Sequence, residues 1–127
     1  MKHIALVMRQ RFVGEAIASM LREKPDCVPH LISDMEDALW YCRDFSPDLV
    51  LIEVSDASED SVDAAVGIGR KFRWQFSDCM RMLFLSKSEK SATLDAAVRA
   101  RQRHLIDSFV TADAGNEYVI ASILSLV

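Results

Sequence analysis

The sequence predicts an α/β protein in which helices cover both faces of a five-stranded parallel sheet. Short apolar segments alternate five times with segments of helical periodicity, and the connections between them are short. The apolar run from Leu49 is unbroken as far as Glu53 and is opened by Pro47. Such a run is typical of a parallel strand buried on both faces. Because right-handed crossovers join parallel neighbours, we expect a doubly wound sheet.

Five segments are predicted to be strands, since each is short, aliphatic and bounded by polar residues or proline. The second segment is the weakest, and Pro29 places it near an edge because proline donates no hydrogen bond to a neighbouring strand. The central one ends in the carboxylate of Glu53. The segments are residues 3–8, 27–32, 49–53, 80–85 and 108–111.

The first helix is expected directly after the first strand. Apolar residues recur there at three-to-four-residue spacing, which predicts an inward stripe that includes Phe12 and Ile17. Pro25 ends this helix because proline removes a backbone donor and clashes with the preceding turn.

Four further helices follow. Ser33 and Glu36 have the spacing of a capping box, so the second helix is predicted to start there. The apolar pattern places the third and fourth helices at about residues 60–73 and 89–104. Asp113 is positioned to cap the last helix.

Length and composition indicate a single globular domain covering residues 1–127. The net charge of −4 gives no general attraction to nucleic acid, so no direct nucleic-acid contact is expected. The amino-terminal apolar segment is too short for a signal peptide, and no apolar run reaches the roughly 18 residues of a membrane span. We therefore expect a cytoplasmic protein that does not contact the membrane.

Two local patterns have a functional and a structural interpretation. Cys27-x-x-His30 resembles half of a zinc site, but no second half follows, and a packing role is favoured. Residues 70–74 combine cations with aromatic rings, which suits nucleic acid, although a solvated helix end accounts for the same composition. The three cysteines are odd in number and widely spaced, which predicts reduced thiols; they are Cys27, Cys42 and Cys79.

Functional groups of such a sheet gather beyond the carboxyl ends of its strands. The residues at those ends are Met8, Arg9, Glu53, Ser86 and Ala112. We therefore expect the functional site among them. No nucleophile elbow, phosphate-binding loop or strand-end histidine base accompanies them, so an enzyme is not expected.

Over essentially its whole length the chain resembles the receiver domain of bacterial two-component response regulators. Residues 47–53 are similar to the family's Pro-Asp-Leu-Val-Leu-(Leu/Ile)-Asp strand, which ends in the phosphorylated aspartate. Ser86 falls at the family's switch Ser/Thr and Phe109 at its switch Tyr/Phe. The resemblance implies a flavodoxin-like (βα)5 fold with strand order 2-1-3-4-5.

The charged members of the family's phosphorylation site are replaced in this chain. Glu53 stands at the phosphoacceptor position, Met8 and Arg9 replace the acidic pair that holds Mg²⁺, and Ala112 replaces the phosphate-contacting lysine. Magnesium requires oxygen ligands, which methionine, arginine and alanine do not supply. The resemblance thus implies a degenerate receiver, or pseudo-receiver, without a metal ion or other cofactor.

The same substitutions suggest a direct ion pair between Arg9 and Glu53, with the guanidinium in place of the metal. Such a pair would hold the site in one state without phosphate. Whether that state is active-like or inactive-like stays open, as does a pocket that has simply decayed.

We therefore predict a signalling domain that acts through phosphorylation-independent protein contacts. The resemblance implies an output face formed by the fourth helix, the fifth strand and the last helix, and a homodimer or a docked partner there. Basic residues of the fourth helix would give this face positive charge. They are Arg99, Arg101, Arg103 and His104. The alternatives are an amino-terminal regulatory domain of a longer transcriptional regulator and a small-molecule-sensing pseudo-receiver.

Overall fold

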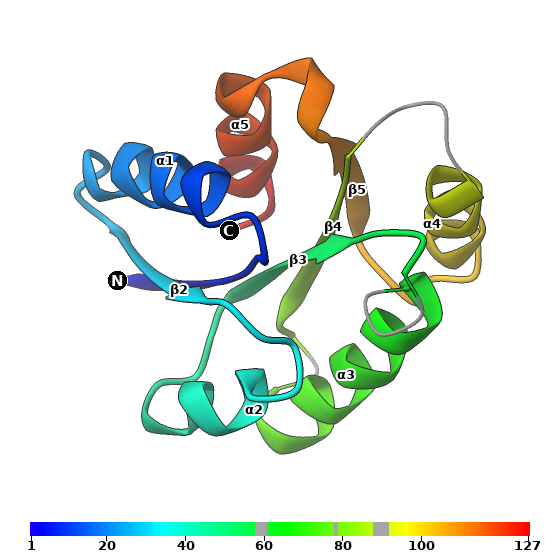
Figure 1. Ribbon diagram of the computed structural model, residues 1–127. Coiled ribbons are helices and arrows are strands. Elements are labelled where there is room, and N and C mark those ends of the chain that lie inside the picture. The colour runs from blue at the N-terminus through cyan, green and yellow to red at the C-terminus, as the bar shows by residue number, and fades with distance from the viewer. Residues whose placement is uncertain (58–60, 78, 88–91) are drawn as a thin grey trace.

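The computed structural model describes residues 1–57, 61–77, 79–87 and 92–127. Five parallel strands form one sheet in the order β2-β1-β3-β4-β5, so the predicted strand order is confirmed (Figure 1). The edge position predicted for the second strand is also correct. The strands are β1 (Lys2–Val7), β2 (Cys27–Ile32), β3 (Leu49–Val54), β4 (Arg81–Ser86) and β5 (Ser108–Thr111).

Helices cover both faces of this sheet. Figure 1 shows α1 and α5 on one face and α2, α3 and α4 on the other. The helices are α1 (Arg11–Arg22), α2 (Ala38–Tyr41), α3 (Val62–Gln75), α4 (Ala92–Gln102) and α5 (Asn116–Leu126). Two 3-10 turns, Cys42–Asp44 and Ala112–Ala114, complete the described secondary structure. The starts predicted for the third and fourth helices, at residues 60 and 89, lie outside the described residues.

Residues of β3 alternate between two apolar layers. Val50 and Ile52 pack in the layer beneath α2, α3 and α4, whereas Leu49 and Leu51 pack in the layer beneath α1 and α5. All four side chains are fully buried, as expected for a central strand covered on both faces. The strand that carries Glu53 is therefore rigidly held from both sides.

The second helix is shorter than predicted. Ser33 does not cap it; instead the Asp34 carboxylate accepts a hydrogen bond of 3.0 Å from the backbone N–H of Glu36. This local contact forms a turn, and α2 begins only at Ala38. The capping-box prediction is wrong because the aspartate side chain competes for the amide that a helical start would use.

The first helix is rotated relative to the predicted stripe. Phe12 is 91% exposed, whereas Gly14 and Ile17 are buried. A β-carbon on Gly14 would lie 2.7 Å from a methyl carbon of Leu31, so glycine allows α1 to approach β2 closely. The expectation that Phe12 packs inward is therefore wrong.

A glycine directly precedes the last helix. Asp113 lies in the preceding 3-10 turn, and Gly115, with a φ of 97°, is the residue that precedes the first turn of α5. The predicted aspartate cap is wrong because the chain needs a left-handed backbone angle two residues later, which glycine adopts at little cost.

Asp107 connects three segments at the entry to β5. Its carboxylate accepts hydrogen bonds from the backbone N–H of Met82 at 2.7 Å, from Arg73 at 3.1 Å and from Arg81 at 3.3 Å. Arg73 also donates to the carbonyl oxygen of Leu105 at 3.2 Å. Arg73, one of the cations of residues 70–74, thus joins α3 to the sheet.

A ring stack joins β1, β2 and the segment before β3. The His3 Nδ1 and His30 Nε2 atoms lie 3.0 Å apart, and the His30 ring stacks on Phe45 at a centroid distance of 3.7 Å. Cys27 packs on the other face of β2, so the half zinc site is not assembled. No group of three His, Cys, Asp or Glu side chains able to hold a metal occurs among the described residues.

We predict that His30 makes folding stability fall in mild acid. Burial, with a smaller contribution from His3, lowers the pKa of His30 below 6.5 in the folded state. The unfolded chain therefore takes up this proton first, and stability is lost as pH falls through 6.5 toward the folded pKa. Urea unfolding at pH 7.5 and pH 5 measures the loss. His30→Phe should reduce it, and the control His104→Gln, at an exposed histidine, should not.

Candidate functional site

The predicted site residues lie at the carboxyl edge of the sheet. Met8 and Ser86 are buried, Glu53 and Ala112 are half-buried, and Arg9 is exposed. Ser86 lies level with Val54 on one side and Thr111 on the other in the strand register. The topology thus brings the ends of β1, β3, β4 and β5 to one edge, as parallel pairing requires.

Glu53 binds the chain at the start of α1. One oxygen of its carboxylate, Oε1, accepts hydrogen bonds from the backbone N–H groups of Arg9, at 2.7 Å, and Gln10, at 3.0 Å. Gln10 precedes the first turn of α1 and provides no side-chain cap, and that turn contains no acidic residue. The Glu53 carboxylate therefore supplies the anion that helix N-termini favour, from a neighbouring strand.

The hypothesis of a direct side-chain ion pair between Arg9 and Glu53 is wrong. Among the described residues, no ion pair joins these two side chains, and Arg9 contributes its main-chain N–H instead. The turn from β1 into α1 already presents two N–H groups toward β3. The backbone already holds these groups in place, so the Glu53 carboxylate binds them at little cost in conformational entropy.

The predicted site residues at this edge offer few ligands for a magnesium ion. Met8 offers a buried thioether, Ala112 offers no donor atom and Arg9 carries positive charge. One oxygen of the Glu53 carboxylate is already engaged by two N–H groups. Because Mg²⁺ takes near-octahedral oxygen ligands, this set lacks the donors that such an ion needs.

A further polar contact at this edge was not predicted from the sequence. The Thr93 hydroxyl hydrogen-bonds to the Asp56 carboxylate, which joins the loop after β3 to the first turn of α4. Both residues line a hollow of about 280 Å³ with Ser55 and Ser61. In the sequence, Asp56 is one of several acidic residues that follow the central strand, and nothing there singles it out. One feature of the sequence could have drawn attention to Thr93: it is a polar residue four positions before Ala97, on the buried stripe of α4.

The face formed by α4, β5 and α5 is hollowed and partly apolar. Phe109, Leu94 and Tyr118 line a hollow of about 530 Å³, and the Tyr118 side chain is 57% exposed. The Arg101 guanidinium lies 5.9 Å from the centroid of the Phe109 ring. Phe109, for which a switch position was expected, therefore lies on this face between a cation and an apolar hollow.

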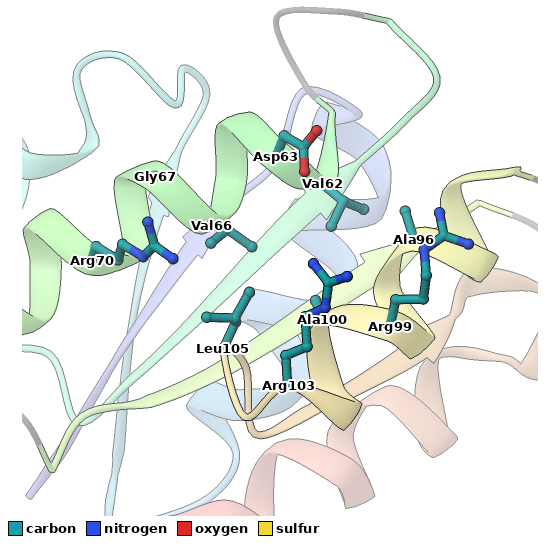
Figure 2. A pocket seen from close by; sticks show the side chains of 10 residues that line it. All are labelled: Val62, Asp63, Val66, Gly67, Arg70, Ala96, Arg99, Ala100, Arg103 and Leu105. Atoms are coloured by element: carbon teal, nitrogen blue, oxygen red, sulfur yellow. The ribbon is translucent and has the colours of Figure 1, made fainter.

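The four basic residues proposed for that face do not share one surface. Arg99 and Arg103 line a groove between α3 and α4 (Figure 2), whereas Arg101 contacts Phe109 beside β5. His104 follows the end of α4 with a φ of 60°. Positions four apart lie on the same side of a helix, and the position between them lies on the opposite side.

Comparison with known proteins identifies the fold. No protein-family model and no curated protein sequence matches this chain. Solved structures match nearly all of it: a LuxR-family DNA-binding response regulator from Staphylococcus aureus has a TM-score of 0.75 at 11% identity, with coverage of 99% of this chain and 98% of the other. The response regulator TrrA from Thermotoga maritima, bound to Mg²⁺ and BeF, has a TM-score of 0.74 at 14% identity, with complete coverage of both chains.

A protein described as an adenylate cyclase, from Rhodopirellula baltica, has a TM-score of 0.79 at 14% identity, with coverage of 98% of this chain and 86% of the other. The fold is that of response-regulator receiver domains, the flavodoxin-like fold expected from the sequence. None of the described helices is long and apolar enough to cross a membrane.

Proposed function

We propose that this chain is a receiver-type signalling domain that acts through protein contacts without being phosphorylated. The observation that carries this proposal is the engagement of Glu53 by the N–H groups of Arg9 and Gln10. The carboxylate at the phosphoacceptor position here serves as a helix cap. Both hydrogen bonds fall on Oε1 and orient the carboxylate toward the start of α1, whereas a nucleophile must have its attacking oxygen aligned with the incoming phosphoryl group.

The surroundings of Glu53 support the same conclusion. Phosphoryl transfer depends on neutralising the negative charge of the phosphate, mainly by a metal ion and a lysine. Met8 and Ala112 provide neither group. We therefore assign the edge of the sheet a structural role and expect the signal to be transmitted by a surface.

The face of α4, β5 and α5 is the proposed contact surface, and a second copy of the chain is the proposed partner. Its hollow contains Phe109 and Tyr118, and Arg101 lies beside it. Aromatic and arginine side chains around an apolar hollow are the residue types that contribute most to protein interfaces. We propose a homodimer through this face.

One experiment with two readouts tests this function. The protein is incubated with acetyl phosphate and Mg²⁺, and its mass and sedimentation are measured. We expect no phosphoryl adduct and a dimer that forms equally with and without acetyl phosphate. Tyr118→Arg, which places a charge in the hollow, should yield a monomer.

A reconstructed pocket serves as the positive control. Combining Met8→Asp, Arg9→Asp, Glu53→Asp and Ala112→Lys restores the family's residue types, and this variant should gain an adduct. An adduct on Glu53 of the unaltered protein would contradict the proposal, as would a dimer that requires acetyl phosphate. A dimer unaffected by Tyr118→Arg would show that the contact surface lies elsewhere.

A further inference from the structure

A groove separate from the proposed dimer face lies between α3 and α4. Its volume is about 410 Å³. Val66 of α3 and Ala100 of α4 are buried at its base, and Leu105 after α4 is half-buried there. Figure 2 shows the two helices as its walls, with the side chains of Arg70 and Arg103 extending from opposite walls toward the space between them.

The groove concentrates positive charge in an acidic protein. Arg70, Arg99 and Arg103 all line it, and Asp63 supplies the one carboxylate among the lining residues that the structure describes. In the part of the chain that the structure describes, none of these guanidinium groups has an ion pair or hydrogen bond. The chain as a whole carries a net charge of −4. Three guanidinium groups around one groove repel each other, and an anionic occupant removes this repulsion.

The groove suits a segment of another protein better than a small molecule. Its charged walls are solvent-exposed, so it lacks the enclosure that buries most of a small ligand. Trp74, 90% exposed, lies one turn beyond Arg70 on α3 and extends the same stripe. Exposed tryptophan and arginine are the side chains that most often anchor protein contacts.

The apolar base between two helices accommodates a third helix, because the side chains of a helix pack into the groove between its neighbours. A second copy placed symmetrically would bring two positive grooves together and be repelled. Nucleic acid is disfavoured by the net charge of −4, which opposes approach outside this groove.

We infer that the α3–α4 groove is a docking site for an acidic amphipathic helix of a partner protein. Apolar residues of that helix pack on Val66 and Ala100, and its carboxylates pair with Arg70, Arg99 and Arg103. This site is independent of the proposed dimer face, since Arg101 and Tyr118 lie on the other side of α4.

Fluorescence anisotropy with a designed probe tests the inference. The probe is a fluorescein-labelled peptide of about 18 residues, five helical turns, with leucines on one face and glutamates four residues apart beside them. Its controls are a scrambled peptide of the same composition and a single-stranded oligonucleotide. The protein variants are Arg70→Glu with Arg103→Glu in the groove, each of these two substitutions alone, and Arg101→Glu as a single charge reversal on the opposite side of α4.

We expect the amphipathic peptide to bind and the scrambled peptide to bind at least tenfold more weakly. The double variant should weaken binding about tenfold or more, while Arg101→Glu changes it less than about twofold. Gly67 lines the groove, and an added β-carbon there meets no other atom within 4 Å, so Gly67→Leu should fill the groove and also weaken binding. Thermal unfolding of each variant confirms that it is folded.

Several outcomes would overturn the inference. They are the absence of peptide binding, equal binding of the scrambled peptide, or equal loss with Arg101→Glu and with the double variant. Tighter binding of the oligonucleotide than of the peptide would assign the groove to nucleic acid instead. None of these results bears on the dimer, whose readout is the sedimentation of Tyr118→Arg.

Discussion

Asp107→Ala is expected to lower the free energy of unfolding by about 2–4 kcal/mol. The carboxylate accepts three hydrogen bonds, one from the backbone of β4 and two from arginines. Its removal leaves Arg73, whose side chain is only 26% exposed, without its carboxylate partner. The buried Nε of Arg73 already has no hydrogen-bond partner among the described residues, so the loss of the carboxylate would leave a second part of this guanidinium unsatisfied.

Urea unfolding measures this effect, and Arg81→Ala is the matched control. Arg81 bonds to the same carboxylate, but its side chain is 54% exposed, so its loss should cost less than about 1 kcal/mol. The loss of unfolding free energy for Asp107→Asn should lie between those of the other two variants, because asparagine keeps an acceptor oxygen and loses the charge. If Asp107→Ala lowers the free energy of unfolding no more than Arg81→Ala does, the hydrogen bonds of Asp107 do not join α3 to the sheet as the geometry indicates.

The sequence predicts the strands next to Asp107 but not the contacts that Asp107 makes. The apolar runs around Leu51 and Leu83 predict the strands because a continuous apolar run is a local pattern, and parallel pairing follows from the short crossovers. The strand order was implied by the resemblance to receiver domains. The contact between Arg73 and Asp107 joins positions 34 residues apart. No local spacing indicates such a pair, and it emerges only when α3 packs beside the entry to β5.

The helix errors have local causes of another kind. The capping-box spacing at Ser33 was real, but the Asp34 side chain bonds to the same stretch of backbone and forms a turn first. At Phe12, the helical spacing of apolar residues predicted burial, whereas the close approach of α1 to β2 requires Gly14 on that face. Helix propensity and apolar spacing are local preferences, and the contacts made in the folded protein override them where the two disagree.

The sequence predicted where on the sheet these residues lie, but not which of their atoms make contact. The strand ends bring Met8, Arg9 and Glu53 to one edge, as parallel topology dictates. The sequence suggested a contact between the charged side chains of Arg9 and Glu53. The position of the main-chain N–H groups depends on the fold and cannot be read from the sequence. The sequence does predict that Arg101 lies on the other side of the helix from Arg99 and Arg103, since these two are four residues apart and Arg101 lies between them.

Glu53→Asp is expected to lower the free energy of unfolding by about 1–2 kcal/mol, the usual cost of losing a helix cap. Shortening the side chain by one methylene withdraws the carboxylate from the N–H groups of Arg9 and Gln10, which it now contacts at 2.7 and 3.0 Å. Glu53→Gln keeps the length and an acceptor oxygen, so it should cost less. Urea unfolding gives the free energies, and hydrogen exchange at these two N–H groups reports the contact itself.

Exchange at the Arg9 and Gln10 N–H groups distinguishes a cap from a general effect on the sheet. Glu53→Asp should speed exchange there by about tenfold while leaving Leu51, in the middle of β3, protected. The substitution restores the family's residue type, yet it alone should produce no phosphoryl adduct, because Met8 and Ala112 stay unchanged. Unchanged exchange at both groups would contradict the capping role. A stabilised Glu53→Asp variant would show that the longer side chain is tolerated there and not required.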